Sequence, residues 1–130
     1  MLLSTEENKA TVRLFYTEVW NNGRVALVDE FIAPSFVNHG FGAETGPDRE
    51  SFKQTIRKVR DELNFQHTVE ELIAEGDTVV ARLSGRGETT GRVRRSGEPL
   101  RGMGVVIWKL QNGEMTERWA WWQPADPEQV

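Results

Sequence analysis

Cysteine is absent from the 130-residue chain, which excludes disulfide bonds, thiolate catalysis and metal sites built on cysteine. No apolar run approaches the roughly 20 residues of a membrane-spanning helix, and the first residues lead into a charged segment without a signal-peptide pattern. The chain also has no excess of positive charge, since it contains 16 Lys and Arg residues and 20 Asp and Glu residues. The composition therefore argues against nucleic acid or a membrane as a partner and fits a cytoplasmic protein.

Histidine is scarce as well, and occurs only at His39 and His67. With no clustered spacing of ligand-type residues around them, we expect no metal site. What is present is an ordinary globular composition, 38% apolar and 28% charged. The length suits one core with room for a pocket. We expect a single domain over residues 1–130, with a core at about 8–123 and a flexible, proline-broken tail at 124–130.

The first half of the chain has the periodicity of helices. Ser4 and Glu7 form a capping box, and apolar residues then recur at helical spacing until residues 21–23, Asn-Asn-Gly. A short second helix is expected over residues 24–31, ended by Pro34. A third helix opens with Pro47 at its first position, where the missing amide donor is harmless, and runs to about residue 63.

The second half has the pattern of strands, at residues 65–74, 78–88, 100–110 and 114–123. The Asn112–Gly113 pair between the last two is a strong hairpin signal. Residues 92–99 are expected to form a loop. Helices followed by an antiparallel sheet predict an α+β fold with the helices on one sheet face. A strongly curved sheet leaves a conical space that side chains or a ligand fill.

The last strand carries three of the five tryptophans. Strict alternation assigns its residues to two faces: Met115, Glu117, Trp119, Trp121 and Gln123 on one, and Thr116, Arg118, Ala120 and Trp122 on the other. A carboxylate flanked by tryptophans has a raised pKa, so Glu117 is a candidate acid or base. The alternative is a structural salt bridge from Glu117 to Arg82, Arg101 or Arg118.

Both histidines have a functional and a structural interpretation. His39 follows a short extended segment beside a glycine-rich loop, where it is either a proton shuttle at a pocket rim or a hydrogen-bonded structural residue. His67 alternates with Phe65 and Val69 on the expected inner face. It is therefore either a core histidine or the group that moves a proton.

The aromatic residues are candidates for a ligand cavity, a core or a dimer interface. We expect Trp119 and Trp121 to line the pocket because they share a face with Glu117. The other candidate substrate contacts are Trp20, Trp108, Trp122 and Tyr16. A cluster of arginines (Arg86, Arg92, Arg94, Arg95 and Arg101) lacks the interleaved aromatics of nucleic-acid platforms and is interpreted as a solvated loop.

Several of these segments together resemble the SnoaL-like polyketide cyclases and the related predicted ester cyclases, within the superfamily of nuclear transport factor two. The resemblance rests on residues 8–21, on 36–40 (Phe-Val-Asn-His-Gly), on Gly46–Pro47, on 69–82 and on 112–119. It implies a cone-shaped α+β barrel, often a dimer, with a hydrophobic pocket that His39 faces. It also implies acid/base chemistry without a cofactor, such as an intramolecular aldol closure of polyketide rings.

The chain departs from the family pattern at two positions. Gln123 stands where many relatives have an aspartate thought to act as acid or base, and Thr89 stands where many have a histidine. Glutamine can polarise a carbonyl but cannot exchange a proton at neutral pH. If Gln123 replaces that aspartate, another residue must supply the base.

The sequence therefore favours a cofactor-free cyclase or isomerase that acts on a hydrophobic carbonyl or epoxide compound. In this hypothesis Glu117 and one histidine move protons, Gln123 and Arg118 orient or polarise oxygen, and tryptophans enclose the rings. The alternative is a non-catalytic binding or dimerisation domain that has lost the acid/base residues. The expected partners are a small hydrophobic substrate and a second copy of the chain.

Overall fold

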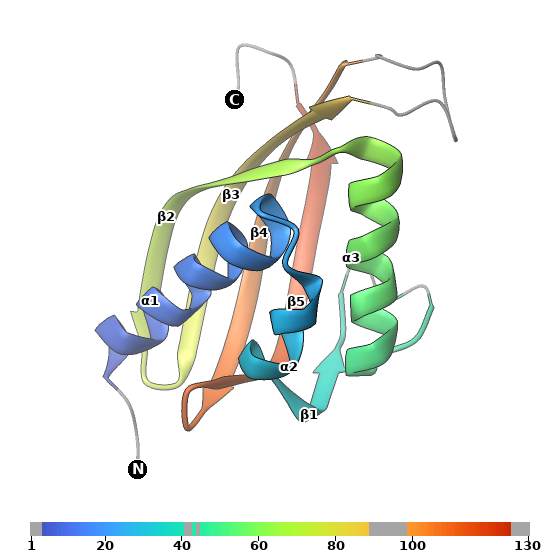
Figure 1. Ribbon diagram of the computed structural model, residues 1–130. Coiled ribbons are helices and arrows are strands. Elements are labelled where there is room, and N and C mark those ends of the chain that lie inside the picture. The colour runs from blue at the N-terminus through green and yellow to red at the C-terminus, as the bar shows by residue number, and fades with distance from the viewer. Residues whose placement is uncertain (1–3, 41–42, 44, 89–98, 126–130) are drawn as a thin grey trace.

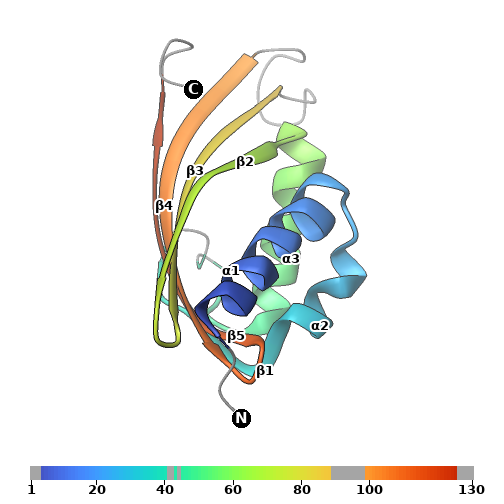
Figure 2. The same ribbon diagram turned by 90° about the vertical axis from the view of Figure 1, so that its left-hand side faces the viewer.

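Helices cover one face of a curved sheet, and the opposite face carries none of the described helices (Figures 1 and 2). This computed structural model describes residues 4–40, 43, 45–88 and 99–125. The elements are α1 (Thr5–Phe15), a π-helical turn (Tyr16–Asn21), a 3-10 turn (Val25–Leu27), α2 (Val28–Phe31), β1 (Ile32–Asn38), α3 (Arg49–Leu63), β2 (Gln66–Glu75), β3 (Thr78–Glu88), β4 (Pro99–Gln111) and β5 (Glu114–Pro124).

The predicted α+β class is confirmed, with a largely antiparallel sheet. The described strands lie in the order β1-β5-β4-β3-β2. Strands β2 to β5 are antiparallel neighbours, whereas β1 runs parallel to β5. Because β1 and β2 are the two edges, the sheet is an open cone and does not close into the expected barrel.

The first helix begins as predicted and ends differently. Ser4 accepts a hydrogen bond from the Glu7 amide at 3.1 Å, and the Glu7 carboxylate accepts one from the Ser4 amide at 3.1 Å. The expected helix continues to Asn21, but its last six residues are π-helical. Such turns are rare and often occur at functional sites. This turn buries Tyr16, Val19 and Trp20.

The other helices begin and end at different residues from those expected. The helix expected over 24–31 is a 3-10 turn followed by the four residues of α2. Pro34 does not end it, because β1 begins at Ile32 and contains Pro34; an edge strand tolerates the missing amide donor. Helix α3 begins at Arg49 rather than Pro47, since Asp48 caps it by accepting from the Ser51 amide at 3.4 Å.

The strands were predicted within a few residues of their ends. The turn between β4 and β5 has positive φ at Asn112 (53°) and Gly113 (83°), as a tight hairpin requires. Strand β5 extends through Pro124, and the Ala125 amide donates to the Arg101 carbonyl at 3.1 Å, so the expected tail begins later than residue 124. The tail at 126–130 and the loop at 92–98 lie outside the described residues.

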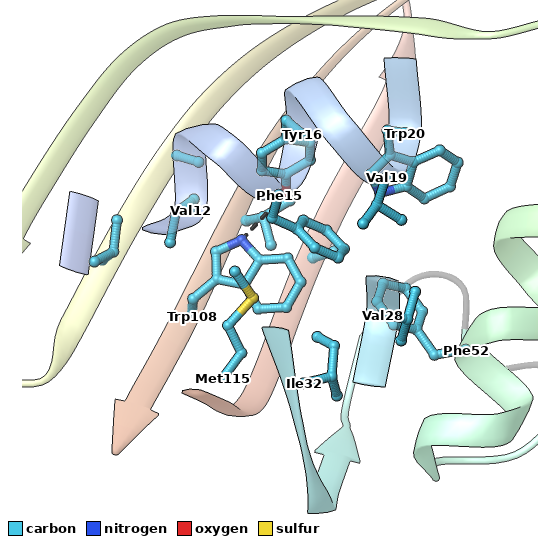
Figure 3. Packing of buried hydrophobic residues seen from close by; sticks show 14 of the residues in the cluster. Val12, Phe15, Tyr16, Val19, Trp20, Val28, Ile32, Phe52, Trp108 and Met115 are labelled. Carbon is cyan, nitrogen blue, oxygen red and sulfur yellow. Dashed lines mark hydrogen bonds between the residues drawn. The ribbon is translucent and has the colours of Figure 1, made fainter. Parts of the chain in front are cut away.

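The core lies between the sheet and the helices, around Trp108 of β4 (Figure 3). Trp108 is fully buried and packs edge-on against Phe15, with ring centroids 5.4 Å apart. Its Nε1 donates to the Tyr16 hydroxyl at 3.2 Å, which satisfies both polar groups. Burial raises the pKa of Tyr16 to about 12, so its hydroxyl stays protonated. Of the described helices, none is long and apolar enough to cross a membrane.

Candidate functional site

An extra residue in β5 decides which side chains face the helices. Lys109 of β4 pairs with Glu117, yet Leu110 pairs with Met115, so Thr116 is unpaired in a bulge. The assignment of Met115 to the face of Glu117 is therefore wrong: Met115 is fully buried among the core residues. Beyond the bulge the alternation is regular. It places Arg118, Ala120 and Trp122 inward and Glu117, Trp119, Trp121 and Gln123 outward.

A cavity of about 220 Å³ lies between the inner sheet face and helix α3. Its walls are mainly aromatic, and two nitrogen-rich side chains enter it. The residues that line it are Trp20, Phe52, Thr55, Val59, Leu63, Phe65, His67, Arg118 and Trp122. It is therefore an apolar space with a few polar groups, the arrangement typical of small-molecule sites.

His67 lies at the centre of the aromatic wall, on the inner face as predicted. Its ring is 4.6 Å from the Trp20 ring centroid, 5.4 Å from Tyr16 and 5.2 Å from Phe65. Its Nδ1 is buried, and no described residue makes a hydrogen bond to it. Burial, with a smaller contribution from the Arg118 charge, lowers the pKa of His67 from 6.5 to about 3. The imidazole is therefore neutral at physiological pH.

The backbone of His67 is held by the side chain of Asn21, the last residue of the π-helical turn. Asn21 Nδ2 donates to the His67 carbonyl and Asn21 Oδ1 accepts from the His67 amide, both at 2.7 Å. Because β2 is an edge strand, the side-chain amide of Asn21 makes the hydrogen bonds that a neighbouring strand would otherwise make with the His67 backbone. Gln66 and Arg60 donate to the Asn21 carbonyl at 3.2 and 3.3 Å and fix the turn in place.

Arg118 is the cation of the cavity. Its side chain is 8% exposed, and its guanidinium lies over the Phe52 ring at 5.0 Å and the Trp108 ring at 5.8 Å. One guanidinium nitrogen donates to Asn38 Oδ1 at 3.0 Å. The same oxygen accepts from the Gly40 amide at 3.3 Å. Arg118 is thus held in a defined position at the wall, where its charge is little screened by water.

Trp122 reaches the cavity because the neighbouring strands provide glycine beneath it. A Cβ at Gly104 or Gly102 would collide with the Trp122 indole, and one at Gly85 would meet Phe65 and Trp122. These glycines form a trough across β3 and β4 in which the indole lies flat. From the sequence, Trp122 is only one of six candidate aromatic residues, because nothing in a single strand indicates the glycines beside it.

Two of the predicted catalytic residues pair with each other on the outer face. His39 Nε2 and Glu117 Oε2 are 2.8 Å apart, and the His39 ring stacks on Trp119 with centroids 4.8 Å apart and planes at 16°. The described side-chain partner of Glu117 is thus His39 rather than Arg82, Arg101 or Arg118. Both side chains are 37% exposed. Strand β5 directs Glu117 and Trp119 to the face opposite Arg118 and Trp122, so neither lines the inner cavity.

Trp121 and Gln123 also lie outside the inner cavity. They border an open groove of about 570 Å³ on the outer face, together with Met103, Val105 and Arg82. Trp121 is 57% exposed. Of the other predicted substrate contacts, Trp20 and Arg118 line the inner cavity, whereas Tyr16 and Trp108 are buried in the core beside it. The residues that the sequence analysis missed are Asn21, Asn38, Phe52 and Phe65.

The fold and this cavity define a class of small α+β proteins with an apolar cavity between a curved sheet and its helices. The chain belongs to the SnoaL-like polyketide cyclase family, whose profile matches residues 10–129. None of the curated proteins compared with it matches. Membership of this family supports an enzyme of cyclase or isomerase type.

Solved structures share the fold. A candidate polyketide cyclase from Acidithiobacillus ferrooxidans superposes with a TM-score of 0.82 at 21% identity, covering 95% of this chain and 92% of that one. IdmH, a candidate polyketide cyclase from Streptomyces antibioticus, gives 0.79 at 24% identity, covering 89% and 91%. AclR, a candidate hydroxylase from Streptomyces galilaeus, gives 0.79 at 18%, covering 92% and 81%. At these identities the likeness establishes the fold, and the chemistry has to be argued from the site.

Proposed function

We propose that the protein is a cofactor-free cyclase or isomerase that moves a proton on a hydrophobic carbonyl compound held in the inner cavity. The observation that supports this most directly is the presence of a guanidinium and a neutral imidazole in one aromatic-lined cavity. Arg118 stabilises negative charge on oxygen, and His67 exchanges a proton. The aromatic walls limit the contact of both groups with water, which strengthens both interactions.

In the proposed step, the carbonyl oxygen of the substrate faces Arg118 and a hydrogen on the adjacent carbon faces the ring of His67. The proton moves to a ring nitrogen, the C–H electron pair forms the enolate double bond, and the carbonyl oxygen becomes an oxyanion. Return of the proton to a different carbon gives an isomer. Attack of the enolate carbon on a second carbonyl closes a ring, and the new alkoxide takes the proton from His67.

The charge of the substrate and the basicity of His67 are coupled in this arrangement. In the empty cavity the Arg118 charge opposes protonation of the imidazole. An oxyanion beside Arg118 offsets that charge, so the pKa of His67 rises as the enolate forms. The imidazole is therefore a weak base before the reaction and a stronger one as negative charge develops.

The test is exchange of substrate hydrogen with deuterated water, which reports proton transfer without knowledge of the final product. A panel of aryl ketones and cyclic 1,3-diketones is incubated with and without the protein, and exchange above the protein-free rate is followed by proton NMR. We expect exchange that is lost in His67→Phe and reduced in Arg118→Met. Glu117→Gln decides between the two faces: loss of exchange in this variant, with His67→Phe active, would assign the base to the Glu117–His39 pair instead.

Gln123→Ala is the corresponding test of the predicted orienting role of Gln123, and lowers exchange only if that role is real. Saturable binding without exchange by any compound would support the alternative of a non-catalytic binding domain. Tryptophan fluorescence separates this case from absence of binding, because Trp20 and Trp122 line the cavity.

We also propose that the outer sheet face is where a second copy of the chain packs. The face carries no described helix (Figure 2), and exposed apolar side chains lie on it at Val37, Ile73, Val105 and Trp121. An apolar surface of this kind is typical of subunit interfaces. Sedimentation velocity should report a dimer for the native chain and a monomer for Trp121→Glu. A monomeric native chain at all concentrations would reject the proposal.

A further inference from the structure

The chemical character of His67 restricts the substrate more narrowly than the fold does. An imidazole whose pKa is about 3 removes protons poorly from a weakly acidic carbon such as that of a simple ketone. A compound that is already acidic can lose its proton without a strong base. Enols of cyclic 1,3-dicarbonyl compounds and hydroxyaromatic rings with electron-withdrawing substituents belong to this class, since their O–H is far more acidic than the C–H of a simple ketone.

The cavity also contains a cation that the negatively charged oxygen of such a compound would face. Arg118 lines the cavity with its guanidinium over the Phe52 and Trp108 rings, and one of its nitrogens donates to Asn38 Oδ1 at 3.0 Å. A cation within about 4–6 Å lowers the pKa of an acidic group by about 1 to 3 units, and more where water is scarce. His67 completes the recognition, because a neutral imidazole both donates and accepts a hydrogen bond.

We infer that the inner cavity selects compact ligands with an acidic hydroxyl or enol group and holds them as oxyanions against Arg118. The inference rests on the proposed function and narrows its substrate class to enolised 1,3-dicarbonyl and hydroxyaromatic compounds. Their O–H proton is released to water on binding, so the bound anion and the Arg118 cation form the pair, and His67 exchanges only the proton at carbon. The volume fits: about 220 Å³ exceeds the 150 Å³ apolar cavity that accepts benzene, so a substituted single ring has room.

The experiment uses 4-nitrophenol, whose anion has a visible absorbance, and 4-nitroanisole, which has the same ring but no acidic proton. Binding of each is measured by quenching of tryptophan fluorescence, and the absorbance of bound 4-nitrophenol is titrated with pH. We expect the apparent pKa of bound 4-nitrophenol to fall by at least one unit. That shift corresponds to the anion binding about tenfold or more tightly than the neutral phenol.

Arginine variants identify the cation responsible. Arg118→Met should abolish the shift while an apolar side chain still fills the wall, and Arg118→Lys should keep part of it. Arg82→Met is the matched control, because Arg82 lies on the outer face, half-exposed and paired with Glu71 at 3.3 Å. It should leave the shift unchanged. A shift that survives in Arg118→Met would overturn the inference.

If an Arg118 variant does not fold, the native chain alone still tests whether the cavity selects oxyanions. Equal affinity for 4-nitrophenol and 4-nitroanisole, with no change in the pKa of the bound phenol, would refute oxyanion selection and leave the apolar cavity of the proposed function intact. Binding of neither compound would reject both, because the cavity then accepts no ring of this size.

Discussion

The buried, neutral state of His67 predicts how the stability of the fold depends on pH. The pKa of its imidazole is lowered to about 3 in the folded chain, against 6.5 when exposed. Between these values the unfolded chain binds a proton that the folded chain excludes, so the free energy of unfolding falls as pH falls. Between pH 7.5 and pH 5, protonation of the exposed imidazole stabilises the unfolded state relative to the folded state by about 2 kcal/mol, the equivalent of about 1.5 pH units.

Urea unfolding followed by far-UV circular dichroism at pH 7.5 and pH 5 measures this loss. His67→Phe keeps an aromatic ring in the wall and cannot titrate, so its loss over the same range should be smaller by about 2 kcal/mol. His39→Gln is the matched control, because His39 is the only other histidine and is 37% exposed. Asp29 and Asp48 have pKa values below 3.8 in the folded chain, so their contributions are lost at lower pH than this window. Equal losses in His67→Phe and the native chain would refute the reasoning.

Three further outcomes follow from contacts in the structure. Gly104→Ala should displace Trp122 from the cavity wall, lower the free energy of unfolding by about 1–3 kcal/mol and weaken quenching by ring ligands, as thermal and fluorescence titrations can check. Ser4→Ala should remove the capping box at a loss of about 1 kcal/mol in urea unfolding, with ligand binding unchanged. Asn21→Leu should release the backbone of His67. Hydrogen exchange of the His67 amide, measured by NMR, should then accelerate at least tenfold relative to amides at the centre of β3. Unchanged exchange would exclude a role for this pair of hydrogen bonds.

Most of the fold could be predicted because local signals agreed with the final packing. The capping box at Ser4 and the Asn112–Gly113 turn each require only the residues that form them, and both are present as expected. The π-helical turn at residues 16–21 could not be predicted, because its apolar spacing is also that of an ordinary helix. What selects it is contact with β2 through Asn21, whose partners in β2 lie 45 and 46 positions further along the chain.

The site was predicted less well, for a single physical reason. Alternation along β5 correctly separated Arg118 from Glu117, but sequence alone does not say which face the helices cover. The density of tryptophan favoured the face of Glu117, whereas the structure gives the inner face to Arg118 and Trp122. His67 was placed correctly because its neighbours in sequence, Phe65 and Val69, are apolar and share its face.

The bulge in β5 also determines where this chain can change in length. Thr116 has no partner in β4, and Met115 and Glu117 flank it on opposite faces. Loss of Thr116 would restore regular pairing and leave every later side chain on its present side. Loss of one residue between Arg118 and Trp122 would exchange the two faces for the remainder of the strand. Within this strand, insertions and deletions in relatives should therefore be confined to the bulge, and one that falls between Arg118 and Trp122 would give the cavity a different set of chemical groups in a single step.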